Sequence, residues 1–191
     1  MKTLGCVVMA AGNARRFGTN KLSAELAGRS LILRALEAVP TEQFETVVVV
    51  TQYPEIMRIA KEFHFAAVHN PHPDQGISHT IALGLTGLRD CDGVLFQVSD
   101  QPLLRRESVA ALAQFWRLHP DKLAALSHDG VRGNPCVFPA RFYSELLALR
   151  EDQGGNAVIR RHEADLLLLE VPARELSDVD TPDALSALKL I

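Results

Sequence analysis

The segment that decides the fold is Met9–Lys21, which reads MAAGNARRFGTNK. It continues directly from the apolar run Leu4–Met9 and holds two glycines, two arginines and a lysine. Glycines let the backbone approach a ligand closely and adopt positive φ, so successive N–H groups can converge on anionic oxygens while the cations neutralise the remaining charge. The segment therefore predicts a phosphate-binding loop after a buried strand. The alternative is an ordinary strand-to-helix turn with surface arginines.

Two well-known nucleotide-binding loops do not fit this segment. A P-loop has four residues between its glycines and Lys-Ser/Thr after the second glycine. Here five residues separate Gly12 from Gly18, and Lys21 stands three positions beyond Gly18 and is followed by Leu22. The G-x-G-x-x-G fingerprint of dinucleotide-binding folds is also missing from the sequence. The loop therefore belongs to another class of phosphate site.

Apolar runs of strand length alternate with amphipathic runs of helical spacing along the chain. The predicted strands are Leu4–Met9, Thr46–Thr51, Ala66–His69, Gly93–Val98, Leu123–Leu126, Cys136–Phe138 and Leu166–Leu169. The predicted helices are Leu31–Val39, Glu55–Phe63, Ile77–Leu88, Glu107–Leu118, Ala140–Leu149, a short helix near Gly155–Arg161 and a closing helix from Pro182. This alternation predicts an α/β fold with a mostly parallel sheet covered on both faces. Ligands bind such sheets outside the carboxyl ends of the strands.

Composition is that of a compact soluble protein. The 191 residues, 47% of them hydrophobic, suffice for one buried core, so we expect a single domain over residues 1–191. The net charge of −3 is not that of a nucleic-acid-binding or membrane-binding protein, and neither partner is expected. No apolar stretch approaches the roughly 20 residues that span a bilayer, and we expect a cytoplasmic protein. The scattered cysteines Cys6, Cys91 and Cys136 are expected to be reduced packing residues.

Asp100 is a candidate metal ligand. It comes shortly after the uncharged run Gly93–Val98, at the probable end of a strand. Magnesium takes one or two protein carboxylates and leaves its other positions to water and substrate phosphates, so an aspartate at this edge fits such a site. The histidines at 69, 72 and 79 lie close in sequence but lack a Cys or Glu at ligand spacing, and no zinc site is expected there. Phe115 and Trp116 have the spacing of core residues.

Five sequence blocks, in order, resemble the MobA-like nucleotidyltransferases. They are the loop A-A-G-x-x-x-R-x-G-x-x-K; Asn70-Pro71 with Gly76-Ile77-Ser78-His79-Thr80; Ser99-Asp100-Gln101-Pro102-Leu103; Arg132-Gly133-Asn134-Pro135; and Asp178-Val179-Asp180-Thr181-Pro182-Asp183. Because the loop has Ala-Ala-Gly and not Ala-Gly-Gly, the chain is most similar to the molybdenum-cofactor cytidylyltransferases. The resemblance implies a Rossmann-like three-layer αβα sandwich with a mostly parallel mixed sheet, as in nucleotide-diphospho-sugar transferases.

The resemblance also implies an activity. The protein is expected to transfer CMP from CTP to the phosphate of a molybdopterin-type cofactor with release of pyrophosphate, and a molybdoenzyme would receive the product. Arg16, Lys21 and Asp100 are the expected catalytic residues, and Mg²⁺ is expected on Asp100 and Asp180. The alternative for Asp180 is a helix N-cap, and Asp178 would share a capping or supporting role. Arg15 matches no cation of the family motif and is expected to face solvent.

The substrate-binding residues follow from the same blocks. Nucleotide binding is assigned to Ala10, Ala11, Gly12, Gly76 and Thr80, with the glycine allowing close approach of the base and the threonine hydroxyl meeting a pyrimidine edge. Acceptor binding is assigned to Arg132, Gly133, Asn134 and Pro135.

Three positions depart from the family pattern, and two other functions remain open. Ser99 replaces a glycine, Thr80 replaces a serine, and Asn156 stands where an arginine is usual; Arg160 or Arg161 could replace that lost cation. One alternative is a nucleotidyltransferase for another small phosphorylated acceptor, a sugar phosphate or methylerythritol phosphate. The other is a non-catalytic nucleotide-binding chaperone for a cofactor.

Overall fold

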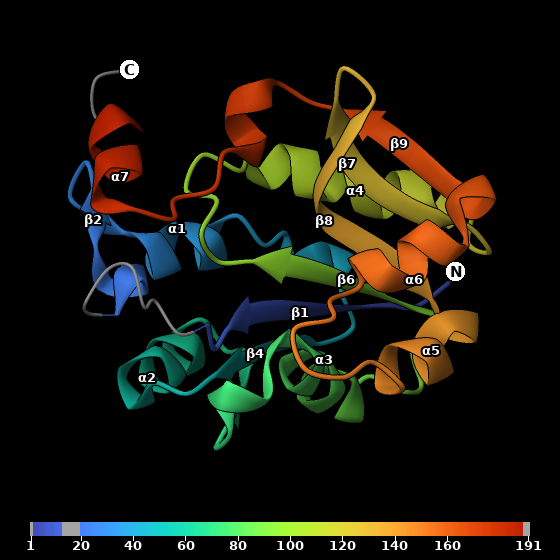
Figure 1. The fold of residues 1–191 in the computed structure, drawn as a ribbon, viewed down its shortest axis with the longest axis horizontal. Coiled ribbons are helices and arrows are strands. Elements are labelled where there is room, and N and C mark those ends of the chain that lie inside the picture. Colours follow the sequence, from blue (N-terminus) through green and yellow to red (C-terminus); the bar gives the residue numbers. More distant parts are fainter. Residues whose placement is uncertain (1, 13–19, 189–191) are drawn as a thin grey trace.

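The protein is described by a computed structural model that covers residues 2–12 and 20–188. In this part of the chain seven strands form one sheet in the order β5-β4-β1-β6-β8-β7-β9 (Figure 1). The strands are β1 (Leu4–Ala10), β4 (Val47–Thr51), β5 (Ala66–His69), β6 (Gly93–Val98), β7 (Leu123–His128), β8 (Val131–Pro139) and β9 (Leu166–Glu170). Neighbouring strands are parallel except that β8 runs antiparallel to both β6 and β7. The sheet is mixed and mostly parallel, as predicted.

Helices cover both faces of the sheet. One face packs on α1 (Leu31–Glu37), α2 (Pro54–Glu62), α4 (Arg106–Leu118) and α7 (Pro182–Leu188), and the other on α3 (Ile77–Thr86), α5 (Tyr143–Leu147) and α6 (Asn156–Arg161). Alternate strand residues supply the two apolar cores: Val49 of β4 faces the first, and Val48 and Val50 face the second. A period of two is the geometry of a strand buried on both faces. The three-layer αβα sandwich is therefore confirmed.

The helix boundaries have local causes. The Ser30 hydroxyl accepts a hydrogen bond from the Leu33 N–H and caps α1, and Pro54 occupies the first turn of α2, where its missing N–H costs nothing. Trp116 is fully buried and confirms the packing interpretation of α4. All three cysteines are free, and Cys6 and Cys136 are buried.

Three features differ from the sequence prediction. A two-stranded hairpin, β2 (Glu25–Leu26) and β3 (Arg29–Ser30), was not predicted. The helix expected over Ala140–Leu149 is a short 3₁₀ turn followed by α5. With this turn, labelled η4, the described residues contain six 3₁₀ turns: η1 (Lys21–Ser23), η2 (Thr41–Gln43), η3 (Pro73–Gln75), η4 (Ala140–Phe142), η5 (Glu163–Asp165) and η6 (Ala173–Leu176). β8 begins at Val131, five residues before the predicted Cys136, because the polar stretch that starts it pairs with β7.

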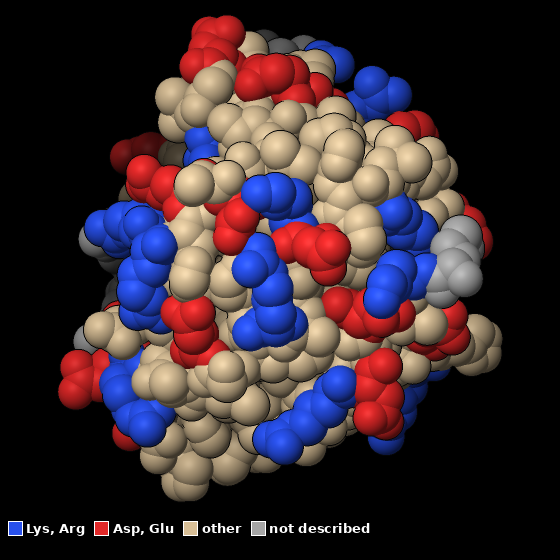
Figure 2. Space-filling model, turned by 90° about the vertical axis from the view of Figure 1, so that its right-hand side faces the viewer, with Lys and Arg blue, Asp and Glu red and all other residues tan. Residues whose placement is uncertain are grey.

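The face at the right-hand side of Figure 1 is formed by α5, α6 and β9. Figure 2 shows basic and acidic side chains interleaved over this face. Ion pairs account for part of that arrangement, among them Lys122 and Arg141 with Asp165, and Arg161 with Glu145. Within residues 2–12 and 20–188, no helix is both long and apolar enough to cross a membrane.

Candidate nucleotide and metal site

A cleft of about 420 Å³ opens at the carboxyl ends of β1 and β6. Successive connections leave this point toward opposite edges of the sheet, since β1 is followed by β4 and β5 on one side and β6 by β8 on the other. Such a switch point is where ligands bind in open α/β sheets. The cleft is lined by Met9, Ala11, Gly12, Lys21, Leu22, Pro73, Asp74, Gly76, Ile77, Thr80, Val98, Ser99, Asp100 and Asp152. Three of the five sequence blocks, those that contain Gly12, Gly76 and Asp100, therefore line one cleft.

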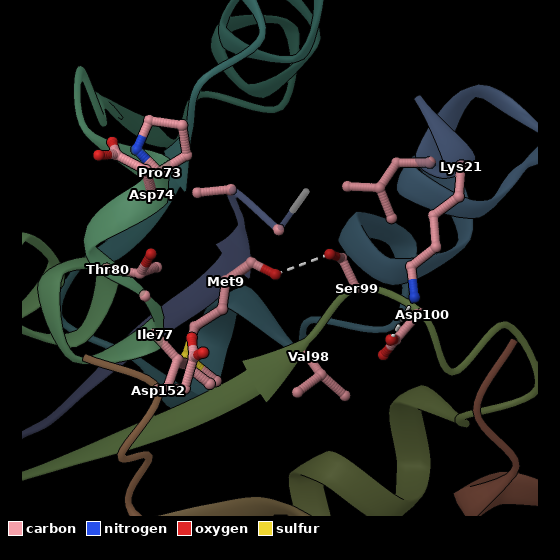
Figure 3. A pocket seen from close by; sticks show the side chains of 14 residues that line it. Met9, Lys21, Pro73, Asp74, Ile77, Thr80, Val98, Ser99, Asp100 and Asp152 are labelled. Atoms are coloured by element: carbon pink, nitrogen blue, oxygen red, sulfur yellow. Dashed lines mark hydrogen bonds and ion pairs between the residues drawn. The ribbon is translucent and has the colours of Figure 1, made fainter. Parts of the chain in front are cut away.

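Ser99 ties the two central strands together at the floor of the cleft. Its hydroxyl donates a hydrogen bond of 2.7 Å to the carbonyl of Met9, in the strand that pairs with β6 (Figure 3). The side chain is buried and thereby has a partner, so serine is compatible with this position although related proteins have glycine. Asp100, the next residue, is presented at the rim.

The start of the glycine loop is held by residues after β4. The Gln52 side-chain amide donates to the Ala11 carbonyl at 2.9 Å, and the Tyr53 hydroxyl donates to the Gly12 carbonyl at 3.2 Å. These two hydrogen bonds hold the backbone of Ala11 and Gly12, and both residues line the cleft. Ala10 is buried in the core at the end of β1 and does not face the cleft. Arg15 and Arg16 lie outside the described residues.

Lys21 reaches into the cleft from η1. The Asn20 side chain accepts a hydrogen bond from the Leu22 N–H and donates to Glu55, which fixes the start of this turn. The Lys21 ammonium then lies 2.8 Å from Asp100 Oδ2 and 3.2 Å from Asp180 Oδ1. Desolvation opposes the charged form, but the hydrogen bond and charge of Asp100, with those of Asp180, raise the pKa of Lys21 overall. Lys21 is therefore positively charged in the cleft.

Asp180 comes from a distant part of the chain. The backbone N–H of Val179 donates to the Asp100 carbonyl at 2.9 Å, which joins the segment before α7 to the end of β6. Thr181 caps α7, because its hydroxyl accepts from the Ala184 N–H, so the Asp180 side chain is free of that task. Nearby, desolvation and the charge of Asp100 raise the pKa of Asp178. The helix-cap alternative for Asp180 is therefore not what the structure shows.

The two carboxylates fit a hard cation. Oxygens of Asp100 and Asp180 converge on one point, at present taken by the Lys21 ammonium. Two carboxylates are a usual protein contribution to a magnesium site. Among the residues that the structure describes, no group of three or more His, Cys, Asp or Glu side chains could hold a metal ion.

Thr80 and Gly76 form the opposite end of the cleft. The Asn70 side chain, which is buried, donates to the Thr80 hydroxyl at 3.2 Å and accepts from the His72 N–H at 2.9 Å. The role of Asn70-Pro71 is thus to fix the loop before α3. Gly76 has φ of +80°, and a Cβ there would lie 2.4 Å from the carbonyl carbon and oxygen of Glu151. The close approach that this glycine permits in the structure is that of the backbone at 151–152.

Of the predicted acceptor residues, Arg132, Gly133 and Asn134 line two cavities outside the cleft, and Pro135 lines neither of them. A cavity of about 270 Å³ adjoins the cleft and shares Met9, Ile77 and Val98 with it; Arg132 and Asn134 line this cavity as well. A second cavity of about 480 Å³ on the other side contains Gly133. Arg132 donates to the side chain of Asn156, the residue that replaces the family arginine. Arg161 is engaged by Glu145 and does not replace it.

Two carboxylates of the cleft were missed in the sequence analysis. Asp74 lies in η3, and Asp152 lies in the loop between α5 and α6. Both are in short polar stretches where no hydrophobic periodicity marks one residue above its neighbours. The only signal was that Asp152 belongs to Asp152-Gln153-Gly154-Gly155-Asn156, a block similar to the family's G-D-x-G-A-R.

Gly12, Lys21 and the two carboxylates of Asp100 and Asp180 lie together at the switch point of an α/β sheet, an arrangement suited to a triphosphate and a metal ion. The sequence pattern of the MobA-like NTP transferase domain matches residues 6–166, and the chain belongs to this family. Among curated relatives, purine catabolism protein PucB of Bacillus subtilis is 26% identical over 190 residues, covering 93% of this chain and 91% of PucB. The 3-deoxy-manno-octulosonate cytidylyltransferase of Francisella tularensis is 32% identical over 97 residues, covering 50% of this chain but only 39% of that protein.

Solved structures share the fold. CMP:2-keto-3-deoxy-manno-octonic acid synthetase in complex with CTP superposes with a TM-score of 0.75 at 15% identity, over 99% of this chain and 98% of that one. The manganese complex of Rv0371c from Mycobacterium tuberculosis gives a TM-score of 0.75 at 18% identity, over 99% of each chain. The fold is therefore shared with these two structures, although fewer than one residue in five is identical.

Proposed function

We propose that this nucleotidyltransferase transfers CMP from CTP to the phosphate of a molybdopterin-type cofactor, with Mg²⁺ as the metal. The observations that carry the proposal are the convergence of Lys21, Asp100 and Asp180 at one end of the cleft and the cavity, lined by Arg132, that adjoins the cleft at Met9, Ile77 and Val98. An enzyme of this kind must align an acceptor phosphate oxygen with the α-phosphorus of the triphosphate. Two adjoining spaces, one with a fixed cation and two carboxylates, suit these two substrates.

The chemistry is an in-line displacement. An oxygen of the acceptor phosphate attacks the α-phosphorus, the bond from that phosphorus to the bridging oxygen of the β-phosphate breaks, and pyrophosphate leaves. Backbone N–H groups of the loop at Gly12 would bind the triphosphate, and Lys21 and Arg16 would offset the charge that develops on its oxygens. Asp100 and Asp180 would hold Mg²⁺, which when bound neutralises and orients phosphates.

Cytosine is proposed because the loop presents Ala11 where the resembling guanylyltransferases have glycine. Its methyl group lies at the wall of the cleft and narrows the space for a base. The relative named a cytidylyltransferase and the fold neighbour with bound CTP support the same nucleotide. They also favour a second candidate acceptor, a sugar acid or sugar phosphate in place of the pterin.

Pyrophosphate release tests both steps. The purified protein is given CTP, GTP or ATP with Mg²⁺ and either molybdopterin or a panel of sugar acceptors. We expect turnover with CTP and molybdopterin, and tighter binding of CTP than of GTP in competition. Tighter binding of GTP would overturn the choice of base, and turnover only with a sugar would overturn the choice of acceptor.

A further inference from the structure

The loop between α5 and α6 closes one end of the nucleotide cleft. The N–H of Ser78, in the first turn of α3, donates to the Glu151 carbonyl at 3.1 Å. Glu151 has a φ of +52°, a backbone conformation that residues other than glycine rarely adopt. The Asp152 carboxylate follows: its Oδ1 lies 2.7 Å from where a Cβ of Gly76 would stand. The hydrogen bond between Ser78 and Glu151 therefore holds the loop on α3 and places the Asp152 carboxylate at the cleft.

The cleft has two chemically different ends. Figure 3 shows Lys21 and Asp100 at one end and Thr80, Ile77 and Asp152 at the other. The first end suits phosphates and a cation. A carboxylate repels phosphates, so the end that holds Asp152 suits the nucleoside. Within the described chain, no side chain forms a hydrogen bond or ion pair with the Asp152 carboxylate, which leaves both oxygens available to a ligand.

At this end of the cleft, Asp152 offers a hydrogen-bond acceptor and Thr80 a donor. An ionised carboxylate only accepts. The Thr80 hydroxyl already accepts from Asn70, so its own proton is available to donate. Cytosine offers an exocyclic amino group beside a ring nitrogen and a carbonyl, whereas uracil places a carbonyl oxygen where cytosine has the amino group. A carboxylate facing that position attracts the first base and repels the second.

We propose that Asp152 is a specificity-determining residue, which accepts a hydrogen bond from the exocyclic amino group of the base and selects a cytosine over a uracil nucleotide. The inference rests on the proposed function, because it requires a pyrimidine triphosphate in this cleft. Asp152 acts on binding and on the choice of substrate, and the phosphate chemistry belongs to the other end of the cleft.

The test compares CTP and UTP affinities, with Mg²⁺, of the wild type, Asp152→Asn and Glu151→Gln. The amide of Asp152→Asn keeps the shape of the side chain but can turn a donor toward the uracil carbonyl. We expect the wild type to prefer CTP and the variant to lose about tenfold or more of that preference, the scale of one hydrogen bond to a charged group. Glu151→Gln removes the same charge from the neighbouring residue and should keep the preference.

The outcomes separate the two proposals. Equal weakening of CTP and UTP by Asp152→Asn, with their ratio unchanged, would assign the carboxylate to a contact common to all nucleotides and overturn the inference alone. A wild type that binds neither pyrimidine triphosphate would overturn the inference together with the proposed function. Thermal melting without nucleotide checks that both variants fold.

Discussion

The Lys21 ammonium lies 2.8 Å from the Asp100 carboxylate and also contacts Asp180 at 3.2 Å, so a lysine occupies the point on which two proposed metal ligands converge. The lysine and a metal ion cannot hold that point together, since like charges repel strongly in a partly desolvated site. We expect the lysine to leave the carboxylates for the phosphates when metal and triphosphate bind.

Lys21→Ala should therefore have opposite effects on two measurements. The affinity for Mn²⁺ without nucleotide should rise, because the competing cation is gone. Turnover with saturating triphosphate should fall. The activation free energy should rise by an amount on the order of 2 to 4 kcal/mol, the usual scale for removing one preorganised charge. Mn²⁺ titration by electron paramagnetic resonance and pyrophosphate release measure these effects. Lys61→Ala, at an exposed position on α2, is the control; near-normal turnover of Lys21→Ala would refute the transition-state role.

Asp100→Asn and Asp180→Asn should each depress magnesium affinity and turnover and leave secondary structure intact. Groups that act through one ion lose most of its contribution when either is removed, so the double variant should be little worse than the poorer single variant. Pyrophosphate release as a function of magnesium concentration measures the coupling. Asp183→Asn, an exposed aspartate in the first turn of α7, controls for charge. Additive losses would show that the two carboxylates do not share an ion.

Gly76→Ala should destabilise the protein more than Gly28→Ala. Both glycines have positive φ, +80° and +74°, and Gly76, with a ψ of −174°, lies in a region that is essentially restricted to glycine. At Gly28 a new Cβ meets nothing within 4 Å, whereas at Gly76 it would overlap the Glu151 carbonyl. The difference between the two melting temperatures measures the backbone strain at position 76 together with the cost of moving the 151–152 backbone. Equal melting temperatures would mean that this loop yields freely.

Acid should weaken a contact at the far end of the sheet. Asp92 accepts hydrogen bonds from the Lys2 ammonium and from the N–H and hydroxyl of Thr3, and these lower its pKa to about 2. A lowered pKa in the folded state means that stability is present above the unfolded-state pKa of about 3.9 and is lost as the pH falls toward 2. Asp92→Asn should lower the melting temperature at pH 6 by a few degrees and nearly not at all at pH 2. Equal shifts at both pH values would contradict the assignment.

The sequence predicted the central strands well because they are buried on both faces and are therefore apolar almost throughout, and Gly93–Val98 was placed at its observed bounds. The edge strand Ala66–His69 was also placed at its observed bounds, although its residues are exposed or only half-buried. The start of β8 was missed because Val131–Asn134 is held by pairing with β7, and pairing with a distant segment leaves no local pattern. The β2–β3 hairpin is too short to show alternation.

The sequence predicted only those residues of the site that stand in recognisable sequence blocks. Gly12, Lys21, Thr80 and Asp100 stand in sequence blocks, and the structure brings them to one cleft. Ala10 stands in the same block but faces the core, since one position along a strand reverses the face on which a side chain lies. Asp152 lines the cleft because the loop between α5 and α6 packs on the first turn of α3. A contact between segments so far apart in the chain leaves no pattern in the local sequence.

The antiparallel direction of β8 has a consequence for how this enzyme can diversify. Parallel strands bring only their last residues to the nucleotide edge, but β8 brings its first, so Arg132 and Gly133 stand there directly after the turn at Asp129 and Gly130. A hairpin tip tolerates insertions and deletions far better than a buried parallel strand does. Lengthening this turn would remodel the wall of the neighbouring cavity and leave the register of β1 with β6 intact. Because we propose that the acceptor binds on this side of the molecule, we expect changes in the length of this turn to alter the choice of acceptor and to leave the residues proposed to bind the triphosphate in place.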